Sequence, residues 1–296
     1  PACKDIKKNQ INSQNSRNKI FLSFSFYKKE KLCFFSRTFI YNLMEEEIIM
    51  YKYLYYFFIY SFLGWCLEVC YAALNTGKFI NRGFLNGPYC PIYGVGVVII
   101  ILFVFPLRKN IFVLFIASVI LTSLLELATG FALEKIFHYR WWDYSNVPFN
   151  IGGYVCLKFS LMWGIACILV VDIIHPLVND FIKFIPHFVG KILLAIMIIM
   201  MTVDLVASVR TVLKLNSRLD RIDKIAVDIH DFSNGIGSKL TSDFLATDEK
   251  IKKLNQEKED LMKKLDWDQR RLLKAFPTMK SNHHKESFDD MKNNLN

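Results

Sequence analysis

The sequence predicts an all-α, polytopic membrane protein with about five transmembrane helices and a charged, helical C-terminal tail. Three observations lead to this fold class. Of the 296 residues, 53% are hydrophobic and 15% are aromatic. The apolar residues are gathered in five long runs, and basic residues exceed acidic ones by ten, with most charges outside those runs. Apolar runs separated by charged segments are typical of membrane proteins.

The five apolar runs are the expected transmembrane helices. A helix needs about 20 mostly apolar residues to cross a bilayer. In chain order the runs are Tyr53–Leu74, about Pro91 to Leu107, Ile111–Leu133, Tyr154–His175 and Phe188–Val209. Five such runs in one stretch of chain argue against the buried helices of a soluble protein. We therefore predict a transmembrane, permease-like domain over residues 44–209.

The first 43 residues differ from the rest of the chain. Residues 1–43 hold nine basic and two acidic side chains, whereas residues 44–209 hold ten of each. They show no apolar periodicity and no cleavage site of a signal peptide. Met44 and Met50 lie just before the first apolar run. We interpret residues 1–43 as a non-native upstream extension, with the true start at Met44 or Met50, or else as a disordered basic tail.

The basic residues of the short loops predict the orientation, because such residues favour the cytoplasmic side. Lys78 and Arg82 follow the first run, Lys135 and Arg140 follow the third, and Arg210 opens the segment after the fifth. An odd number of spans places all of these on one side. We predict a multi-pass protein of the bacterial inner membrane, in contact with the lipid bilayer, with a cytoplasmic C-terminus.

The chain after the fifth run is polar but periodic. Residues 210–277 are expected to form amphipathic or coiled-coil helices, and residues 278–296 a disordered tail. The apolar seam of the first tail helix has a 4-3-4-3 spacing and consists of Leu215, Leu219, Ile222, Ala226 and Ile229. This seam predicts either a cytoplasmic helical hairpin or self-association through residues 212–232. Residues 210–296 hold eighteen basic and fifteen acidic side chains, and this near balance argues against a nucleic-acid partner.

Several motifs of catalysis and cofactor binding are missing from the sequence. No P-loop motif occurs, so the chain is not its own ATPase. The seven cysteines form no CxxC pair, and neither HExxH nor GxSxG is present. We therefore expect no cofactor, no metal site and no enzymatic activity.

Polar residues inside and beside the expected spans are the candidates for a substrate-binding site. Acidic residues inside a span are costly and mark function or packing. Two loops dense in Gly, Pro and aromatic residues contain arginines whose guanidinium groups can hold carboxylates or phosphates. Pairing of these arginines with Glu68, Glu126 or Asp143 is the alternative. The candidate residues are Glu68, Arg82, Asn86, Glu126, Arg140 and Asp143.

A shift of 58 residues superposes one half of the apolar region on the other. It aligns Phe57 with Phe115, Leu63 with Leu121, Leu67-Glu68 with Leu125-Glu126, Phe79 with Phe137, Arg82 with Arg140, and Gly94 with Gly152. This pattern suggests two parallel helix–loop–helix units related by an axis along the membrane normal. The identities are few, so a chance match is the alternative.

The loop motifs also carry a family resemblance. The motifs are Phe62-Leu63-Gly64-Trp65 with Glu68, the Asn81–Gly94 loop, Arg140-Trp141-Trp142-Asp143-Tyr144, and His175-Pro176. Together they resemble a bacterial family of type IV ABC-transporter permeases, called CmpB-like. The match spans about Tyr53 to Phe181. The resemblance implies a permease that works with a separate ATP-binding subunit, which agrees with the missing P-loop, and it carries over no substrate or catalytic residue.

The sequence thus favours an integral membrane permease-like protein, the membrane subunit of an ABC-type transporter. Two alternatives remain open. One is a membrane-embedded enzyme for lipid head groups, in which Glu68 or Glu126 is a general acid or base. The other is a membrane sensor or scaffold that signals through its coiled-coil tail.

Overall fold

The structure, a computed structural model, describes residues 45–236 and 243–294. The expected upstream extension over residues 1–43 lies outside this part. The chain divides between Tyr53 and Leu54 into two compact units, and every contact given below lies within the second unit. Its helices and strands after the first helix, Glu45–Thr76, are α2 (Pro91–Phe103), η1 (Phe105–Leu107), α3 (Ile111–Phe137), β1 (Tyr139–Arg140), β2 (Asn150–Ile151), β3 (Val155–Cys156), α4 (Leu157–Leu169), η2 (Val170–Ile174), α5 (His175–Lys183), α6 (His187–Ile236), α7 (Asp243–Lys263), α8 (Trp267–Ala275), β4 (Lys280–Ser281) and α9 (Lys285–Asn293).

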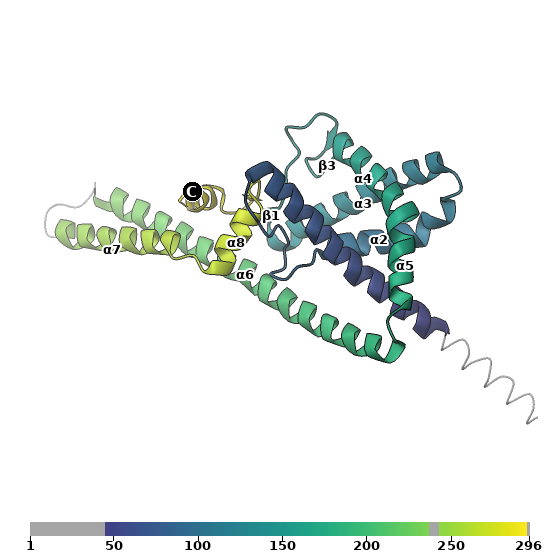
Figure 1. Cartoon of the computed structure of the whole chain (residues 1–296). Helices are drawn as coiled ribbons and strands as arrows, with labels where there is room; N and C mark the ends of the chain where they lie inside the picture. Colours follow the sequence, from purple (N-terminus) through teal and green to yellow (C-terminus); the bar gives the residue numbers. More distant parts are fainter. Residues whose placement is uncertain (1–44, 237–242, 295–296) are drawn as a thin grey trace, which may run out of the picture. The chain divides into compact units, whose positions relative to one another are not determined.

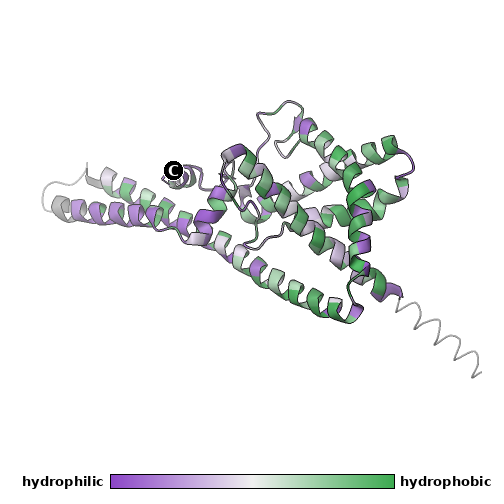
Figure 2. Ribbon diagram, in the orientation of Figure 1, coloured by the Kyte–Doolittle hydropathy of each residue, from purple (hydrophilic) through white to green (hydrophobic). Residues whose placement is uncertain are grey.

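Within the described part of the chain, four helices are long and apolar enough to cross a membrane, which confirms the all-α, polytopic fold class. These spans are Glu45–Thr76, Ile111–Phe137, Leu157–Lys183 and the apolar part of His187–Ser233. Figure 2 shows that α3, α4 and the first half of α6 are hydrophobic, whereas the second half of α6 mixes hydrophobic and hydrophilic residues and α7 is mostly hydrophilic.

The second expected span is shorter than the sequence suggests. Helix α2 contains 13 residues, which at 1.5 Å per residue is about 20 Å, less than the roughly 30 Å of a hydrocarbon core. It follows residues 77–90, here named the first loop. The backbone N–H of Cys90 donates to the carbonyl of Ser61 at 2.9 Å, in the middle of the first helix. The first loop therefore returns along that helix for about 22 Å before α2 begins.

The pair α3 and α4 repeats this arrangement. Residues 138–156, here named the second loop, end where α4 begins beside the middle of α3, and Ser123 Oγ donates to Ser160 Oγ at 2.7 Å. Helix α4 then continues through the π-helical turn η2 into α5. The π turn precedes Pro176, whose missing N–H cannot continue the regular hydrogen-bond ladder.

Contacts of two glycines show how the helix pairs correspond. A Cβ at Gly94 would overlap Phe57 and Ser61, and a Cβ at Gly164 would overlap Phe115 and Val119. Phe57 and Ser61 are related to Phe115 and Val119 by the 58-residue shift, so the repeat of the first helices is supported. The second helices follow a shift of 70 residues instead.

The predicted pairing of Gly94 with Gly152 is therefore wrong. Gly152 has a φ of +59° in the turn between β2 and β3, whereas Gly94 lies inside a helix. Relative to the first half, α3 extends three residues further, the second loop is five residues longer and α4 begins four residues earlier, so the equivalent helical glycine lies 12 residues later, at Gly164.

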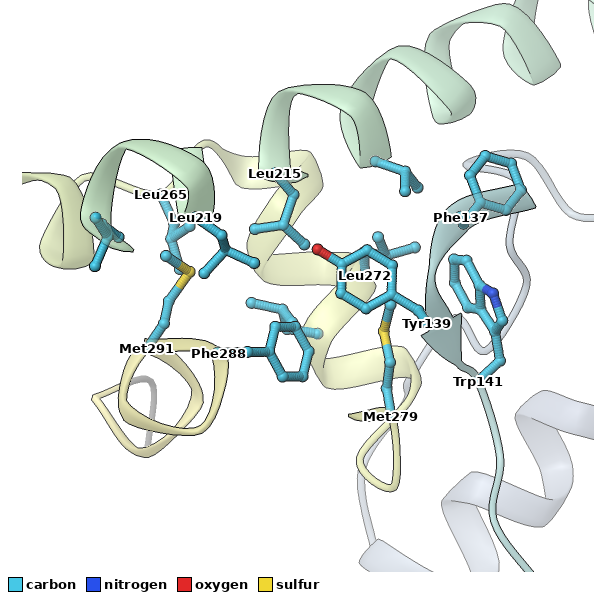
Figure 3. Close-up of a cluster of buried hydrophobic side chains, with 13 residues drawn as sticks. Phe137, Tyr139, Trp141, Leu215, Leu219, Leu265, Leu272, Met279, Phe288 and Met291 are labelled. Carbon is cyan, nitrogen blue, oxygen red and sulfur yellow. The ribbon is translucent and has the colours of Figure 1, made fainter. Parts of the chain in front are cut away.

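Helix α6 is 50 residues long and forms a helical hairpin with α7 (Figure 1). Residues 264–294, here named the C-terminal segment, pack against α6 and the second loop. Figure 3 shows the apolar cluster at this contact, in which Tyr139 and Trp141 of the second loop lie beside Leu272, Met279 and Phe288. Strand β4 also pairs with β1, Tyr139 opposite Ser281 and Arg140 opposite Lys280.

Two expectations for the tail change as a result. Residues 278–294 contain β4 and α9, with Met279, Phe288 and Met291 fully buried, so the expected disordered tail is ordered over that range. Leu215, Leu219 and Ile222 of the seam are also fully buried, inside the chain's own cluster. Self-association through residues 212–232 would therefore have to use another face of α6.

Candidate functional site

Glu68 of the first helix has two polar partners, one from the first loop and one from α2. The Nε atom of Arg82 forms a salt bridge with its Oε2 at 3.3 Å, and the Tyr93 hydroxyl donates to its Oε1 at 2.6 Å. Arg82 comes from the first loop and Tyr93 from the first turn of α2. The re-entrant path of the first loop thus supplies both partners of an acidic residue that lies within a span.

Glu126 is the counterpart of Glu68 on α3. The Tyr144 hydroxyl of the second loop donates to its Oε1 at 3.2 Å. Its Oε2 is buried without a hydrogen-bond partner among the described residues. The hydroxyl of Tyr144 interacts electrostatically with Tyr93 and with both glutamates. We name Glu68, Tyr93, Tyr144 and Glu126 the glutamate centre.

Arg140 belongs to a separate ionic network in the second loop. Its Nε lies 3.0 Å from Glu134 Oε2, and its Nη1 lies 3.7 Å from Asp143 Oδ1. The C-terminal segment joins this network, because Lys280 Nζ contacts Asp143 Oδ2 at 2.6 Å and Asn282 donates to Glu134 at 2.8 Å. The hydrogen bond from Lys280, then that from Ser145, holds the pKa of Asp143 well below its ordinary value.

Asn86 contacts an acidic residue of α6 through its backbone N–H group. The N–H groups of Asn86 and Gly87 donate to the two carboxylate oxygens of Asp204 on α6, at 3.1 and 2.7 Å. On the same loop, Arg271 of α8 donates to the carbonyls of Gly83 and Phe84, at 2.9 and 3.0 Å. Burial lowers the pKa of Arg271. The first loop is therefore fixed from both sides by charged groups that accept from and donate to its backbone.

The six predicted site residues thus fall into three places. Glu68, Arg82 and Glu126 lie at the glutamate centre, Arg140 and Asp143 form the ionic network of the second loop, and Asn86 rests on Asp204. The alternative that the arginines pair with acidic residues is found for both of them.

A family model covers the part of the chain that builds this site. The model, described as "Putative ABC-transporter type IV" (ABC_trans_CmpB), matches residues 55–209. The chain belongs to this family. The match confirms the resemblance carried by the loop motifs and extends it to Val209, within α6. Together with the four long apolar helices, it identifies a multi-pass membrane protein of an ABC-transporter-related family.

The family match includes the first loop, the second loop and the glutamate centre, and it ends within α6, before the second half of that helix, α7 and the C-terminal segment. Comparisons with curated proteins and with solved structures give no match. The contacts of the C-terminal segment with both loops are therefore a feature that the family match does not describe.

The sequence did not reveal three important partners: Tyr93, Tyr144 and Arg271. Tyr93 lies one residue before Gly94 and Tyr144 one residue after Asp143, inside motifs that were singled out for other residues. Arg271 lies in a charged helix with no signal for contact with the membrane domain. The sequence did offer one signal for the two tyrosines. Each lies in or just after a loop that has to pack against a glutamate of a span, and a tyrosine hydroxyl can donate a hydrogen bond to that carboxylate.

Proposed function

We propose that this protein is an integral membrane permease, the membrane subunit of an ABC-type transporter whose ATP-binding subunit is a separate chain. Family membership supports the ABC-related part of the proposal. The missing P-loop accounts for the separate ATP-binding subunit, because the chain cannot hold ATP phosphates by that motif.

The observation that carries the transport proposal is the pair of re-entrant loops that meet acidic residues within the spans. Secondary transporters place binding sites near the midplane at the interface of repeated units, with discontinuous helices around them. Here α2 and α4 both begin beside the middle of a longer helix, and a tyrosine hydroxyl reaches each glutamate, from the first turn of α2 (Tyr93) and from the second loop (Tyr144). Irregular backbone at this depth is expected only where it is buried in protein or lines a cavity.

We propose the glutamate centre as the substrate site, and binding without catalysis as its role. Both glutamates accept hydrogen bonds from tyrosine hydroxyls, and Glu68 is also paired with Arg82. These contacts favour ligand binding over a role as general acid or base. Basic residues of short loops favour the cytoplasmic side of a membrane. Arg82 and Arg140 therefore support a bacterial inner-membrane protein in which both arginines lie on the cytoplasmic side.

Co-purification from native membranes tests the proposed function. The chain, carrying an affinity tag, is solubilised in mild detergent after mild cross-linking and analysed by mass spectrometry and by an ATPase assay. We expect a P-loop protein in a stable ratio to the chain, together with ATP hydrolysis in the preparation. A preparation without an ATP-binding protein and without ATP hydrolysis, from cross-linked and untreated membranes alike, would overturn the proposal.

A matched pair of variants links the partner to the site. Glu68→Gln removes a charge from the glutamate centre, whereas Asp172→Asn removes one from an exposed position in η2. We expect both variants to retain the ATP-binding partner and only Glu68→Gln to change the rate of ATP hydrolysis, by at least about tenfold, or 1.4 kcal/mol of activation free energy.

A further inference from the structure

The two halves of the membrane domain are related by an approximate two-fold axis that passes between α2 and α4. The shift of 70 residues aligns residues 91–110 with residues 161–180 without a gap and matches Gly94 with Gly164 and Pro106-Leu107 with Pro176-Leu177. Residues related by this shift also contact each other. The rings of Tyr93 and Trp163 lie 5.6 Å apart, and those of Phe105 and His175 lie 5.3 Å apart.

Contacts between equivalent residues are what a two-fold axis requires, because only residues close to the axis meet their own counterparts. Tyr93 and Trp163 therefore mark the axis at one level, and Phe105 and His175 mark it at another. Glu68 bonds to Tyr93, and the Tyr144 hydroxyl that holds Glu126 interacts electrostatically with Tyr93. The glutamate centre thus lies at the axis, with one glutamate from each half.

The symmetry is broken in charge. Arg82 pairs with Glu68, but its counterpart Arg140 pairs with Glu134 and Asp143. Glu126 has no salt bridge within residues 45–236 and 243–294, and its Oε2 is buried without a hydrogen-bond partner there. The glutamate centre with Arg82 therefore contains two carboxylates and one guanidinium.

The charged and titratable groups around Glu126 leave this carboxylate without a fixed cation. The second loop presents Tyr144, α2 presents Tyr93, and the first helix presents Glu68, which Arg82 already neutralises. Lys158 of α4 is exposed, and its Nζ lies 5.9 Å from the centroid of the Phe159 ring. Tyr144 bonds only Oε1, and Oε2 is a buried carboxylate atom with no cation among the described residues to neutralise it, which is costly inside a membrane domain, so Glu126 is expected to take up a positive charge.

We propose that Glu126 is a binding site for one exchangeable positive charge, either a proton or a small monovalent cation, and that this charge accompanies the transport cycle. The site deepens the proposed function, since it makes the glutamate centre selective for substrates that bring or displace a single positive charge. Binding at Glu126 does not require the ATP-binding subunit, so it can be tested on the purified chain alone.

The test for a proton is infrared spectroscopy of the full chain in lipid nanodiscs. The C=O stretch of a protonated carboxylic acid is recorded while the pH is raised from 5 to 9. We expect a band that disappears over this range, is lost in Glu126→Gln and is kept in the exposed intramembrane control Asp172→Asn. Glu126→Asp should restore a titrating band with a shifted midpoint, which separates loss of the acid from misfolding.

The test for a cation is the thermal unfolding midpoint of the same preparation in NaCl, KCl or methylammonium chloride, at a constant ionic strength set with choline chloride. We expect a saturable rise with one of these cations that Glu126→Gln abolishes and Asp172→Asn retains. A titrating band without a cation effect identifies the proton as the ligand, and a cation effect without a band identifies the cation.

The proposal is overturned if the wild-type chain shows neither signal, or if Glu126→Gln, monodisperse in size-exclusion chromatography, keeps whichever signal the wild type shows. Neither result would affect the co-purification of an ATP-binding partner. Failure of this inference and failure of the proposed function are therefore separate outcomes.

Discussion

At the scale of single residues, the first loop shows how an irregular backbone is accommodated inside a membrane domain. Its N–H and C=O groups lie outside regular helix hydrogen bonding, so inside a membrane domain they need protein partners. Asp204 accepts from two N–H groups, Arg271 donates to two carbonyls, and Asn81 accepts from the Gly83 N–H and donates to the Asn86 carbonyl. The charged side chains around the loop are therefore structural components of the membrane domain.

Asp204 provides the first prediction at this scale. In Asp204→Asn one of the two acceptor oxygens becomes an NH₂ group that faces a backbone N–H, so one loop donor loses its partner. We expect a loss of about 1–3 kcal/mol in the free energy of unfolding, measured as a lower thermal midpoint in detergent. Asp172→Asn, at an exposed position, should change stability by less than about 0.5 kcal/mol. Equal midpoints for the two variants would contradict the role of Asp204.

The sequence predicted some of these residue contacts and missed others for a physical reason. Pairing of Arg82 with Glu68 and of Arg140 with Asp143 was foreseeable, because a long basic side chain near an intramembrane acid has few other partners. Contacts of Tyr93 and Tyr144 depend on the rotation of helices about their axes and on the path of each loop. Neither quantity can be read from spacing along a single chain.

At the scale of elements, α2 shows why an apolar run need not be a complete span. The run from Pro91 to Leu107 is apolar enough, but the helix ends at Phe103, and Pro106 lies in the short turn η1. Proline lacks an N–H and favours the first turn of a helix, so it marks the end of α2. The first loop takes the place of the rest of the expected span. Its Gly and Pro content could be read from the sequence, but its return along the first helix could not.

Close packing of α2 on the first helix gives the second prediction. A Cβ at Gly94 would overlap the backbone carbonyl of Phe57, which cannot move without distorting the first helix, whereas a Cβ at Gly96 would meet only the flexible end of Leu125, at 3.0 Å. We expect Gly94→Ala to cost about 1–3 kcal/mol and Gly96→Ala to cost less. Thermal unfolding of both variants in the same detergent measures the difference, and a larger loss for Gly96→Ala would be inconsistent with the packing described.

The repeat of these elements could be predicted only in part. A constant shift finds the first helices, because Leu67-Glu68 and Leu125-Glu126 keep their spacing in both halves. It loses the second helices, because the second loop contains additional residues that form β1 and the β2–β3 hairpin. The equivalence of Gly94 and Gly164 became visible only from the residues that each glycine touches.

At the scale of the whole molecule, the C-terminal segment contacts both loops of the membrane domain. Arg271 reaches the first loop, and Lys280 and Asn282 reach the second. The sequence suggested disorder after Thr278, because α9 is a polar helix of only nine residues. Such a helix is marginal alone and becomes stable here through tertiary packing of Phe288 and Met291.

The salt bridge between Lys280 and Asp143 predicts a pH dependence of this contact. Because the pKa of Asp143 is lowered in the folded state, its contribution is present above the ordinary pKa of about 3.9 and is lost as the pH falls. Lys280 is 60% exposed, so we expect Lys280→Ala to cost less than about 1 kcal/mol at pH 7. The difference from wild type should be constant above about pH 4 and should shrink as the pH falls further and Asp143 becomes protonated in the folded state.

Thermal unfolding of both proteins across this pH range measures that difference. Lys285→Ala, which removes an exposed lysine of α9, is the control and should show no such change. A difference between wild type and Lys280→Ala that stays constant as the pH is lowered from about 4 to about 2 would exclude the ion pair as its source.

Phe288 provides a prediction for attachment of the whole C-terminal segment. Its side chain is fully buried in the cluster of Figure 3, and Phe288→Ala should cost about 3–5 kcal/mol of local stability. We expect faster proteolysis within residues 264–294, with the spans left intact. Trp267→Ala, at a side chain that is 71% exposed, should leave the rate unchanged. Equal cleavage rates for the two variants would show that the segment is held by other contacts.

The contact between Arg271 and the first loop has a consequence for biosynthesis. The carbonyls of Gly83 and Phe84 precede Arg271 by 188 and 187 residues. At about 5–20 residues per second, a ribosome takes roughly 10–40 s to add that length of chain. The first loop is thus synthesised well before its guanidinium partner, and its contacts are completed only after α8 has left the ribosome.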